Sequence, residues 1–357
     1  MKDLRRKHDI QHSKPWITAE DIRAVESVLH SGMIAQGDLV NRLEHAVAAY
    51  MSLQGGVATS NGTSALILSL SALGVGKGDE VIIPTYVCPA VWEAVVVSGG
   101  TPVLCDVGDD WCMNAETVRG CLSKRTKVII VVHLYGIKTD VEEISDLGIP
   151  IVENCAQSFG SKDQKGLCGN AGEICVCSFH ATKLLTTGEG GAALTKDSKL
   201  LSRLKELKYG ETDDMRGPYP YGMTDIQAAL GLSQLKRYPQ FLERRRRIAK
   251  YYFEHIDQSK AVLPYSVMKR SIFHRFPLRV CGDIDRLREE FAAEGIQVRR
   301  GVDRLLHRQL GMSPNGFPGA ERCFAETLSI PIYPALGNAE RDTIVNVTNL
   351  ILKKSRT

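Results

Sequence analysis

The segment with the clearest potential for covalent chemistry runs from residue 179 to residue 191 and contains one lysine, Lys183. Its neighbours are small, apolar or hydroxyl-bearing, and a glycine cluster follows. An apolar niche favours the neutral amine of a lysine, because burial disfavours the charged form. A neutral amine can attack a carbonyl carbon and form a Schiff base. Taken alone, Lys183 is better explained as a surface lysine in a loop, so the interpretation depends on other segments.

A second segment, residues 60–65, closes a predicted strand and opens an apolar helix over residues 66–73. Backbone N–H groups at a helix N-terminus bind anions, and phosphate suits them best. Gly62 lets the backbone approach a ligand closely, and the hydroxyl groups of Thr63 and Ser64 add donors. A plain helix N-cap explains the same residues, and by itself it is the commoner case.

Polar side chains also follow two further predicted strands. Strand alternation directs Glu153 and Asn154 to opposite faces at the end of one strand, and Ser178 ends the next strand, five residues before Lys183. Hydrogen bonding within loops also explains such residues. Together, however, a phosphate cradle, a polar strand-end side chain, a hydroxyl and a lysine suit pyridoxal 5′-phosphate (PLP), which needs a phosphate anchor, a pyridine-nitrogen partner and a Schiff-base lysine.

The elements that must position these residues are short apolar runs that alternate with helical patterns. This rhythm predicts an α/β fold with a mostly parallel, seven-stranded sheet covered by helices on both faces. Ligands of such sheets bind beyond the carboxyl ends of the strands, where the motifs above lie. The runs span residues 56–59, 81–84, 102–107, 127–134, 150–153, 174–178 and 191–195.

Helical patterns flank this predicted sheet. Two helices precede it, over residues 19–31 and 38–51, and a long one follows over residues 224–255. We place a change of domain within the long helix, which gives a large PLP-binding domain over residues 1–235 and a small C-terminal domain over residues 236–357. The small domain reads as α+β, with strands at 273–280 and 298–300 and helices at 284–294, 319–327 and 339–353.

Composition excludes several classes of protein. The net charge of +4 over 357 residues is too small for a nucleic-acid-binding footprint. No apolar run is long enough to span a membrane, and the polar start of the chain lacks the apolar core of a secretory signal. The ten cysteines include no CxxC pair, so buried packing explains them better than a zinc site does. We therefore expect a cytoplasmic protein with reduced thiols.

The ordered motifs of the chain resemble those of the DegT/DnrJ/EryC1/StrS family, the sugar aminotransferases among the fold-type I PLP enzymes. Each motif is weak alone, but their order along nearly the whole chain is specific. The motifs are Ser31-Gly32 with Gly37, residues 61–66, residues 78–84, residues 133–136, residues 153–157, Ser178-Phe179 with Lys183 and residues 188–191, residues 223–229 and residues 328–331.

The resemblance implies roles for the matching positions. Lys183 is expected to carry PLP as a Schiff base and to shuttle a proton, as a catalytic residue. The expected cofactor-binding residues are Gly62, Thr63, Ser64, Cys88, Asn154, Gln157, Ser178 and Lys183. Tyr135, Tyr221 and His307 are the expected substrate residues. The substrates implied are an amino donor, glutamate or glutamine, and a keto acceptor, a nucleotide-linked keto sugar. Family members are dimers with shared active sites, so a homodimer is expected, without nucleic acid or membrane.

Four positions depart from the family pattern. Asn154 stands where the family has an aspartate, which keeps the pyridine nitrogen protonated by its opposite charge; an amide cannot do so comparably, so we expect slowed or altered transamination. Cys88 stands where relatives stack an aromatic residue on the ring, and the alternatives are that Tyr86 or Trp92 substitutes or that Cys88 itself packs there. Pro220 and Gly222 replace an asparagine and an arginine. The asparagine of relatives reaches the phosphate of the neighbouring subunit, and Tyr219, Tyr221 or a backbone N–H is the candidate replacement.

Two alternatives remain beside the aminotransferase. One is an elimination or dehydration on the same fold, although the sugar dehydratases of the family carry histidine in place of the lysine, and His180 is out of register with Lys183. The other is a regulatory protein that binds PLP without turnover. The keto acceptor itself is not identified by the sequence, and Trp111, Tyr135, Arg299, Arg300 and His307 are candidates for its pocket.

Overall fold

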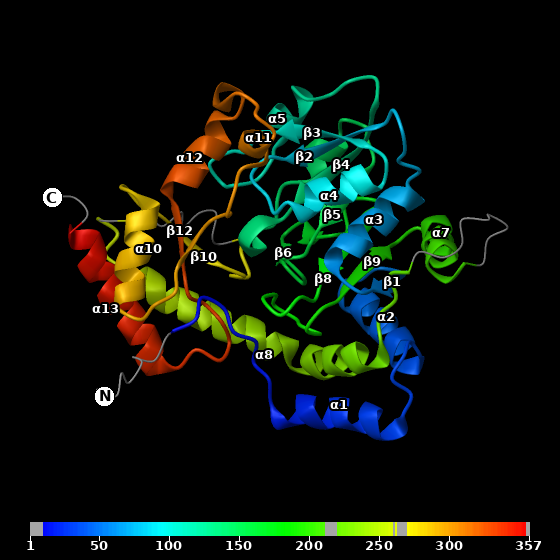
Figure 1. The fold of residues 1–357 in the computed structure, drawn as a ribbon, viewed down its shortest axis with the longest axis horizontal. Helices are drawn as coiled ribbons and strands as arrows, with labels where there is room; N and C mark the ends of the chain where they lie inside the picture. Colours follow the sequence, from blue (N-terminus) through cyan, green and yellow to red (C-terminus); the bar gives the residue numbers. More distant parts are fainter. Residues whose placement is uncertain (1–9, 211–219, 260, 263–269, 355–357) are drawn as a thin grey trace, which may run out of the picture.

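The computed structural model describes residues 10–210, 220–259, 261–262 and 270–354, and its centre is a sheet of seven strands (Figure 1). The order is β1-β9-β8-β5-β4-β2-β3, and of these strands β9 alone runs against the others. The predicted α/β fold with a mostly parallel sheet is therefore confirmed. The strands are β1 Gly55–Thr59, β2 Glu80–Pro84, β3 Thr101–Cys105, β4 Thr126–Val132, β5 Ile151–Asn154, β8 Ile174–Ser178 and β9 Gly191–Thr195.

Helices cover both faces of this sheet. Alternation along the strands sends Val57 and Val176 into one core and Ala58 and Cys177 into a second. The first core includes α3 Gly62–Ala72 and α4 Ala90–Val97, and α7 Ser198–Tyr209 packs beside α3. The second includes α2 Asp38–Tyr50 and the long α8 Asp225–His255, and α1 Ala19–Ser31 packs on the outside of α8 (Figure 1). Two short helices, α5 Ala115–Arg119 and α6 Glu142–Ser145, lie in the connections.

The start of α8 fixes two helices at once. Thr224 and Gln227 form a capping box at its N-terminus, which satisfies backbone donors that the helix cannot pair itself. Asp225, the first residue of α8, is buried and accepts the N–H groups of Gly37 and Val40 at 2.9 and 3.0 Å. A carboxylate at the N-terminus of α2 is favoured by the helix dipole, so this pair of contacts joins α2 to α8.

The C-terminal part forms a smaller α+β unit. Its sheet is antiparallel in the order β10-β12-β11, with β10 Phe276–Arg279, β12 Thr327–Ile330 and β11 Arg299–Arg300. Its helices are α10 Ile284–Ala293, α11 Leu306–Gln309, α12 Pro318–Glu326 and α13 Asn338–Lys354. The sequence analysis missed β12, a four-residue run directly after a helix, and the small hairpin of β6 Lys162–Asp163 and β7 Gly166–Leu167.

The N-terminal segment and the long helix connect the two parts. Ile10 forms a parallel bridge with Ile296, and His12 bonds to the hydroxyl of Ser329 in β12 at 2.9 Å. The division predicted at residue 235 falls inside α8, which continues through it without interruption. That division into two domains stays a prediction.

Within the described residues, none of the helices combines the length and the apolar character needed to cross a lipid bilayer.

Candidate active site

The candidate active site lies at the edge of the large sheet where parallel strands end. There β1 leads into α3 at Gly62, β5 ends at Asn154, and β8 ends at Ser178. The loop after β8 is held by bonds from Thr187 N–H to the carbonyl of Phe179 at 2.8 Å and from Lys183 N–H to the carbonyl of His180 at 2.9 Å. The sheet thus brings together residues that are more than one hundred positions apart in the chain.

The N-terminus of α3 has the form of an anion cradle. A Cβ on Gly62 would lie 2.9 Å from that of Ser178, so only glycine permits this approach of α3 to β8. The Asn61 side chain accepts the N–H of Ser64 at 2.8 Å, which leaves the first N–H groups of the helix for a ligand. The hydroxyl of Thr63 has no partner among the described residues. Asn61 is therefore the N-cap, and a phosphate fits the donors that the cap does not use.

Lys183 is half-buried in the loop that follows Ser178, the residue that approaches Gly62 of the cradle. Burial, reinforced by the nearby guanidinium of Arg275, lowers the pKa of its amine to about 8, and the thiol of Cys88 opposes this shift. With this pKa about a tenth of the amine is unprotonated and nucleophilic at pH 7, and about half at pH 8. The apolar neighbours Leu184 and Leu185 are buried, which agrees with the niche expected from the sequence.

The amides of Asn154 and Gln157 are oriented by the backbone. Asn154 Oδ1 accepts the N–H of Ala156 at 3.0 Å, and Gln157 Oε1 accepts the N–H of Tyr135 at 2.8 Å. With both oxygens used in this way, each residue presents its NH₂ group as a donor. Donors in these positions fit an unprotonated pyridine nitrogen and a ring oxygen, the groups for which the sequence analysis proposed them.

The residues near position 88 include an exposed thiol, that of Cys88, and a buried aromatic pair. Tyr86 bonds to the hydroxyl of Tyr135 at 3.0 Å, and Tyr135 packs edge-on against Trp111 with ring centroids 5.5 Å apart. Tyr86 and Tyr135 are therefore engaged with each other in the core. Of residues 86 and 88, only Cys88 keeps its side chain exposed.

The segment with two family departures runs beside the start of α3. The carbonyl of Tyr221 accepts the N–H of Ser60 at 2.8 Å, and Tyr221 is half-buried. Pro220 and Gly222 are exposed, and Tyr219 lies outside the described residues. Tyr221 is the member of this segment placed by a backbone contact close to the phosphate cradle.

The structure places the predicted substrate residue His307 in the packed interior. Its ring is fully buried and stacks on Phe317 at 4.4 Å between centroids. Its Nδ1 bonds to Thr85 Oγ1 at 2.8 Å and its Nε2 to Glu321 Oε1 at 2.9 Å. A substrate contact would have to break one of these bonds, so the observed role of His307 is to join α11 to β2 and α12.

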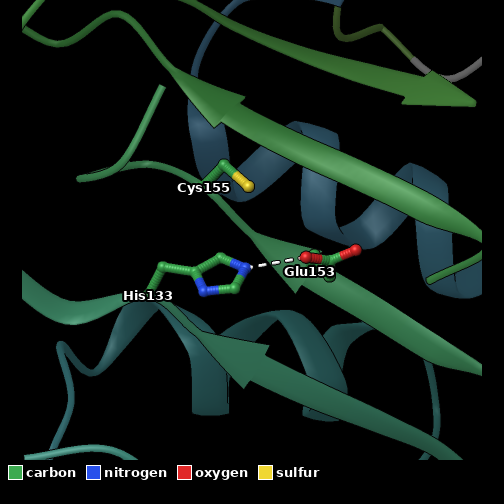
Figure 2. A group of neighbouring side chains, drawn as sticks. All are labelled: His133, Glu153 and Cys155. Carbon is green, nitrogen blue, oxygen red and sulfur yellow. Dashed lines mark hydrogen bonds and ion pairs between the residues drawn. The ribbon is translucent and has the colours of Figure 1, made fainter. Parts of the chain in front are cut away.

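A buried acid–base pair lies behind Asn154. Figure 2 shows His133, Glu153 and Cys155, whose possible ligand atoms lie within 4.8 Å of one another. His133 Nδ1 accepts the N–H of Thr139 at 3.0 Å, so Nε2 carries the proton and donates to Glu153 at 2.8 Å. Both imidazole nitrogens are used, and a metal ion would have to displace these bonds. The spacing suits a metal, but the hydrogen bonds define a structural network.

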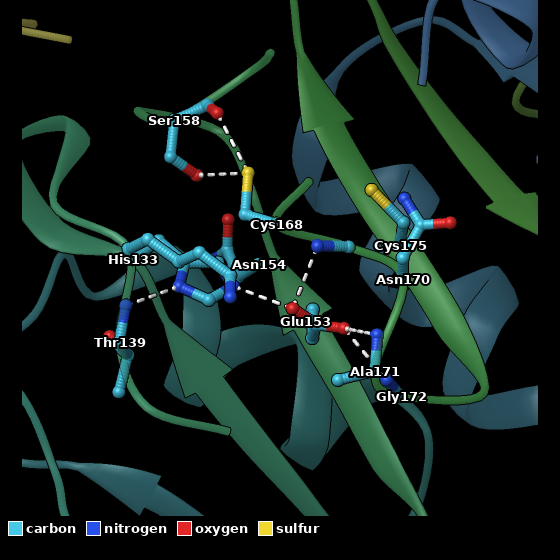
Figure 3. A network of polar contacts seen from close by, with 12 residues as sticks. His133, Thr139, Glu153, Asn154, Ser158, Cys168, Asn170, Ala171, Gly172 and Cys175 are labelled. Carbon is cyan, nitrogen blue, oxygen red and sulfur yellow. Dashed lines mark hydrogen bonds and ion pairs between the residues drawn. The ribbon is translucent and has the colours of Figure 1, made fainter. Parts of the chain in front are cut away.

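Glu153 is the centre of that network (Figure 3). Its carboxylate accepts the N–H groups of Gly169, Ala171 and Gly172, each at 2.7 Å, besides the bond from His133. Burial opposes ionisation, but the hydrogen bonds from His133 and from these N–H groups outweigh it and lower the pKa of Glu153. Because His133 N–H also donates to the Asn154 carbonyl at 3.2 Å, the network holds the strand ends that carry Asn154.

We expect Glu153→Gln to destabilise the protein by about 3 kcal/mol, because one amide oxygen cannot accept the bonds of two carboxylate oxygens and buried N–H groups are left unpaired. Urea unfolding followed by circular dichroism measures the change. The control is Glu143→Gln, an exposed glutamate on α6, which should change stability by less than about 0.5 kcal/mol. Equal midpoints for both variants would contradict this role for Glu153.

Two residues near Lys183 were not found from the sequence. His274 is buried, and the charge of Lys183 contributes to lowering its pKa; Arg275 acts on both Lys183 and His274. They belong to the segment before β10, more than ninety positions from Lys183. Their one signal in the sequence is an adjacent histidine and arginine at the start of an apolar strand.

The fold and the site together define a class of protein. A family model described as the DegT/DnrJ/EryC1/StrS aminotransferase family matches residues 15–349, and the chain belongs to this family of enzymes. The resemblance seen in the sequence motifs and the assignment as an aminotransferase are thereby confirmed.

Particular relatives agree with this assignment. The chain is 32% identical over 348 residues to GDP-perosamine synthase of Escherichia coli O157:H7, covering 92% of this chain and 94% of the relative. It is 29% identical to the UDP-4-amino-4-deoxy-L-arabinose–oxoglutarate aminotransferase of Shewanella sediminis, covering 93% and 95%. Among solved structures, the PLP form of Spr1654 from Streptococcus pneumoniae has a TM-score of 0.91 and 28% identity, covering 98% of this chain and all of the other.

Proposed function

We propose that the protein is a PLP-dependent aminotransferase that moves an amino group from glutamate or glutamine to the keto group of a nucleotide-linked sugar. The observation that carries the proposal is that the strand ends which carry an anion cradle and two oriented amides also lead into the loop of Lys183, an amine of lowered pKa. The names of the relatives, which concern perosamine and aminoarabinose, support a sugar as the acceptor.

The residues fit PLP at each of its polar groups. The start of α3, with Thr63, Ser64 and Ser178, would hold the phosphate; Asn154 would donate to the pyridine nitrogen and Gln157 to the ring hydroxyl. Lys183 Nζ would form the Schiff base with the aldehyde carbon. Bound PLP supplies an electron sink that permits cleavage of a bond at the amino-bearing carbon. Cys88 would lie against the cofactor where its exposed thiol faces the site.

Within this proposal Lys183 has two roles. The donor amine displaces its Nζ, which is then free to act as a general base. Its lowered pKa suits it to remove the proton from Cα of the donor near neutral pH. The buried Glu153–His133 pair keeps the strand end rigid while Asn154 holds its partner.

The experiment that tests the proposal is a screen by absorbance. The PLP-loaded protein is converted with L-glutamate, and the recovery of the original visible band is followed with keto-sugar nucleotides and with cyclitol ketones as acceptors. Recovery with a keto-sugar nucleotide supports the proposal. A band that is indifferent to every amino donor would instead indicate a protein that binds PLP without turnover.

We expect the loading of PLP onto the cofactor-free protein to report the lowered pKa of Lys183. If the pKa is about 8, the neutral fraction of the amine rises about fivefold between pH 7 and pH 8 and flattens above about pH 9. Stopped-flow absorbance at fixed PLP concentration measures the rate. A rate that still rises about tenfold per pH unit between pH 9 and pH 10 would show an amine with an ordinary pKa.

We also propose a homodimer in the cytoplasm. Several exposed apolar side chains gather in the N-terminal helical segment, namely Ile17, Ile22, Leu29, Met33 and Ile34, and such groups are typical of interaction surfaces. All ten cysteines are free thiols, which agrees with a reducing compartment. Sedimentation velocity of the purified protein tests the dimer, and a monomer at all concentrations would contradict it.

A further inference from the structure

A segment of the smaller unit, residues 271–275, is fastened to the strand-end loop of the large sheet. The N–H of Ile272 donates to the carbonyl of Gly136, and the hydroxyl of Ser271 donates to the carbonyl of Tyr135, both at 3.1 Å. A Cβ on Gly136 would lie 3.1 Å from the backbone nitrogen of His274. The two chain segments therefore meet at the edge of the sheet that carries the active-site residues.

Both sides of this junction have a left-handed backbone at a residue other than glycine. Tyr135 has a φ of 57° and Phe273 a φ of 58°, values that aromatic residues rarely adopt. Contacts hold the second of these: Phe273 N–H donates to Ser271 Oγ at 2.8 Å, and buried Arg245 donates to the carbonyl of Phe273 at 2.9 Å. Strain that is held in place by several bonds is typical of functional sites.

This junction positions His274, a residue that is 7% exposed. Neither of its nitrogens has a hydrogen-bond partner within the described part of the chain. Buried polar groups are normally paired, so the imidazole is a donor without its acceptor. Burial first, and then the charged or titratable groups Lys183, Arg275, Arg245 and His12, hold its pKa well below the ordinary value. The ring is therefore neutral and carries one N–H.

The next residue, Arg275, adds a positive charge, and only some of its N–H donors have acceptors among the described residues. Arg275 is half-buried, and its Nη1 donates to the carbonyl of Gly301 at 2.8 Å. The described residues offer no acceptor to its other guanidinium nitrogens. Its charge acts on Lys183, and no carboxylate of the described residues offsets it there. Among the described residues, this group of side chains thus combines the guanidinium of Arg275 and the amine of Lys183 with a free imidazole N–H, and no carboxylate is hydrogen-bonded to any of them.

We propose that Arg275 and His274 bind the carboxylate of the amino donor beside Lys183; this site rests on the proposed function. A guanidinium binds a carboxylate through paired N–H groups, and the neutral imidazole adds a third donor. An amino-acid carboxylate is attached to the carbon that reacts, so it must lie next to the lysine. The diphosphate of a nucleotide sugar is separated from the reacting carbon by the sugar ring, which places it farther from Lys183.

The test measures the binding of maleate, a dicarboxylate without an amine, to the PLP-loaded protein by calorimetry. Arg275→Met should weaken maleate binding about 10- to 100-fold, the range for a lost charged hydrogen bond. Arg275→Lys should recover part of it, and His274→Phe, which keeps the volume, should weaken it about two- to tenfold. The matched control is Arg286→Met, an exposed arginine of α10, which should bind maleate as the wild type does.

Two further measurements are needed. One distinguishes a carboxylate from a nucleotide phosphate as the bound anion, and the other distinguishes a failure of the proposed carboxylate site from a failure of the proposed function. UDP and GDP should bind Arg275→Met as they bind the wild type, and borohydride should still trap PLP on Lys183 in every variant. The proposed site is overturned if maleate binds Arg275→Met and the wild type equally, if the wild type binds no maleate, or if the nucleotides alone lose affinity. An absence of the Lys183 adduct from the wild type would instead overturn the proposed function.

Discussion

Lys183→Ala is expected to remove the visible absorbance of the PLP-loaded protein and to lower the transamination rate by about 10³-fold or more. The variant loses both the amine that forms the Schiff base and the base that moves the proton, and proton transfer by a positioned side chain alone contributes about 10²- to 10⁴-fold. Because Lys183 is half-buried and its loop is held by backbone bonds, the fold should persist. Spectra and single-turnover rates with L-glutamate measure the effect.

The control for this result is Lys199→Ala, an exposed lysine of α7, which should keep the wild-type spectrum and rate. Borohydride reduction followed by peptide mass mapping locates the covalent adduct directly. Added methylamine should restore part of the rate of Lys183→Ala, because it supplies a small amine to the vacated space. An adduct at another lysine, or a normal spectrum in Lys183→Ala, would contradict the assignment.

Asn154→Asp is expected to speed the reaction with L-glutamate by about tenfold or more. A carboxylate beside the pyridine nitrogen raises the pKa of that nitrogen by about 1 to 3 units, and each unit corresponds to a factor of about ten in the ratio of protonated to unprotonated nitrogen. The present amide uses Oδ1 for the N–H of Ala156 and has only its NH₂ group to offer. In the variant, one carboxylate oxygen can keep that bond while the other faces the nitrogen.

Stopped-flow absorbance of the donor half-reaction measures this change, since the acceptor need not be known. Asn41→Asp, an exposed position at the start of α2, adds the same charge far from the strand end and should leave the rate unchanged. A fast wild-type reaction that Asn154→Asp does not alter would show that the amide serves the chemistry as well as a carboxylate.

Local patterns in the sequence were sufficient for the central sheet, and together with the ordered motifs they proposed the cofactor-site residues. Strands buried on both faces are continuous apolar runs, so the runs at 81–84 and 174–178 predicted β2 and β8 within a residue at each end. The same rule places ligands at the carboxyl ends of the strands, which brings Gly62, Asn154 and Ser178 to one edge. Short elements such as β12 and the β6–β7 hairpin contain too few residues to show a recognisable alternation of apolar and polar side chains.

The partners of the side chains could not be derived in this way. His307 matched a substrate-binding position of relatives, but its ring is enclosed by Glu321 and Phe317 of the smaller unit and by Thr85, which follows β2 of the large sheet. Glu153 was expected at a strand end, either beside a ligand or in hydrogen bonds with a loop, and three backbone N–H groups of a turn bond to its carboxylate. The Thr85 contact joins positions that are distant in the chain, and the others depend on how turns fold back, so no periodic pattern of the sequence encodes them.

By itself, the sequence determined the α/β sheet and the family, and it proposed Lys183 as the centre of the chemistry, because periodicity and ordered motifs are local properties of the chain. Only the tertiary structure decided which groups surround that lysine. His274 and Arg275 come to it from the smaller unit through a strained junction with Tyr135. The physical reason is that the charge around a buried amine is the sum over all segments that pack against it.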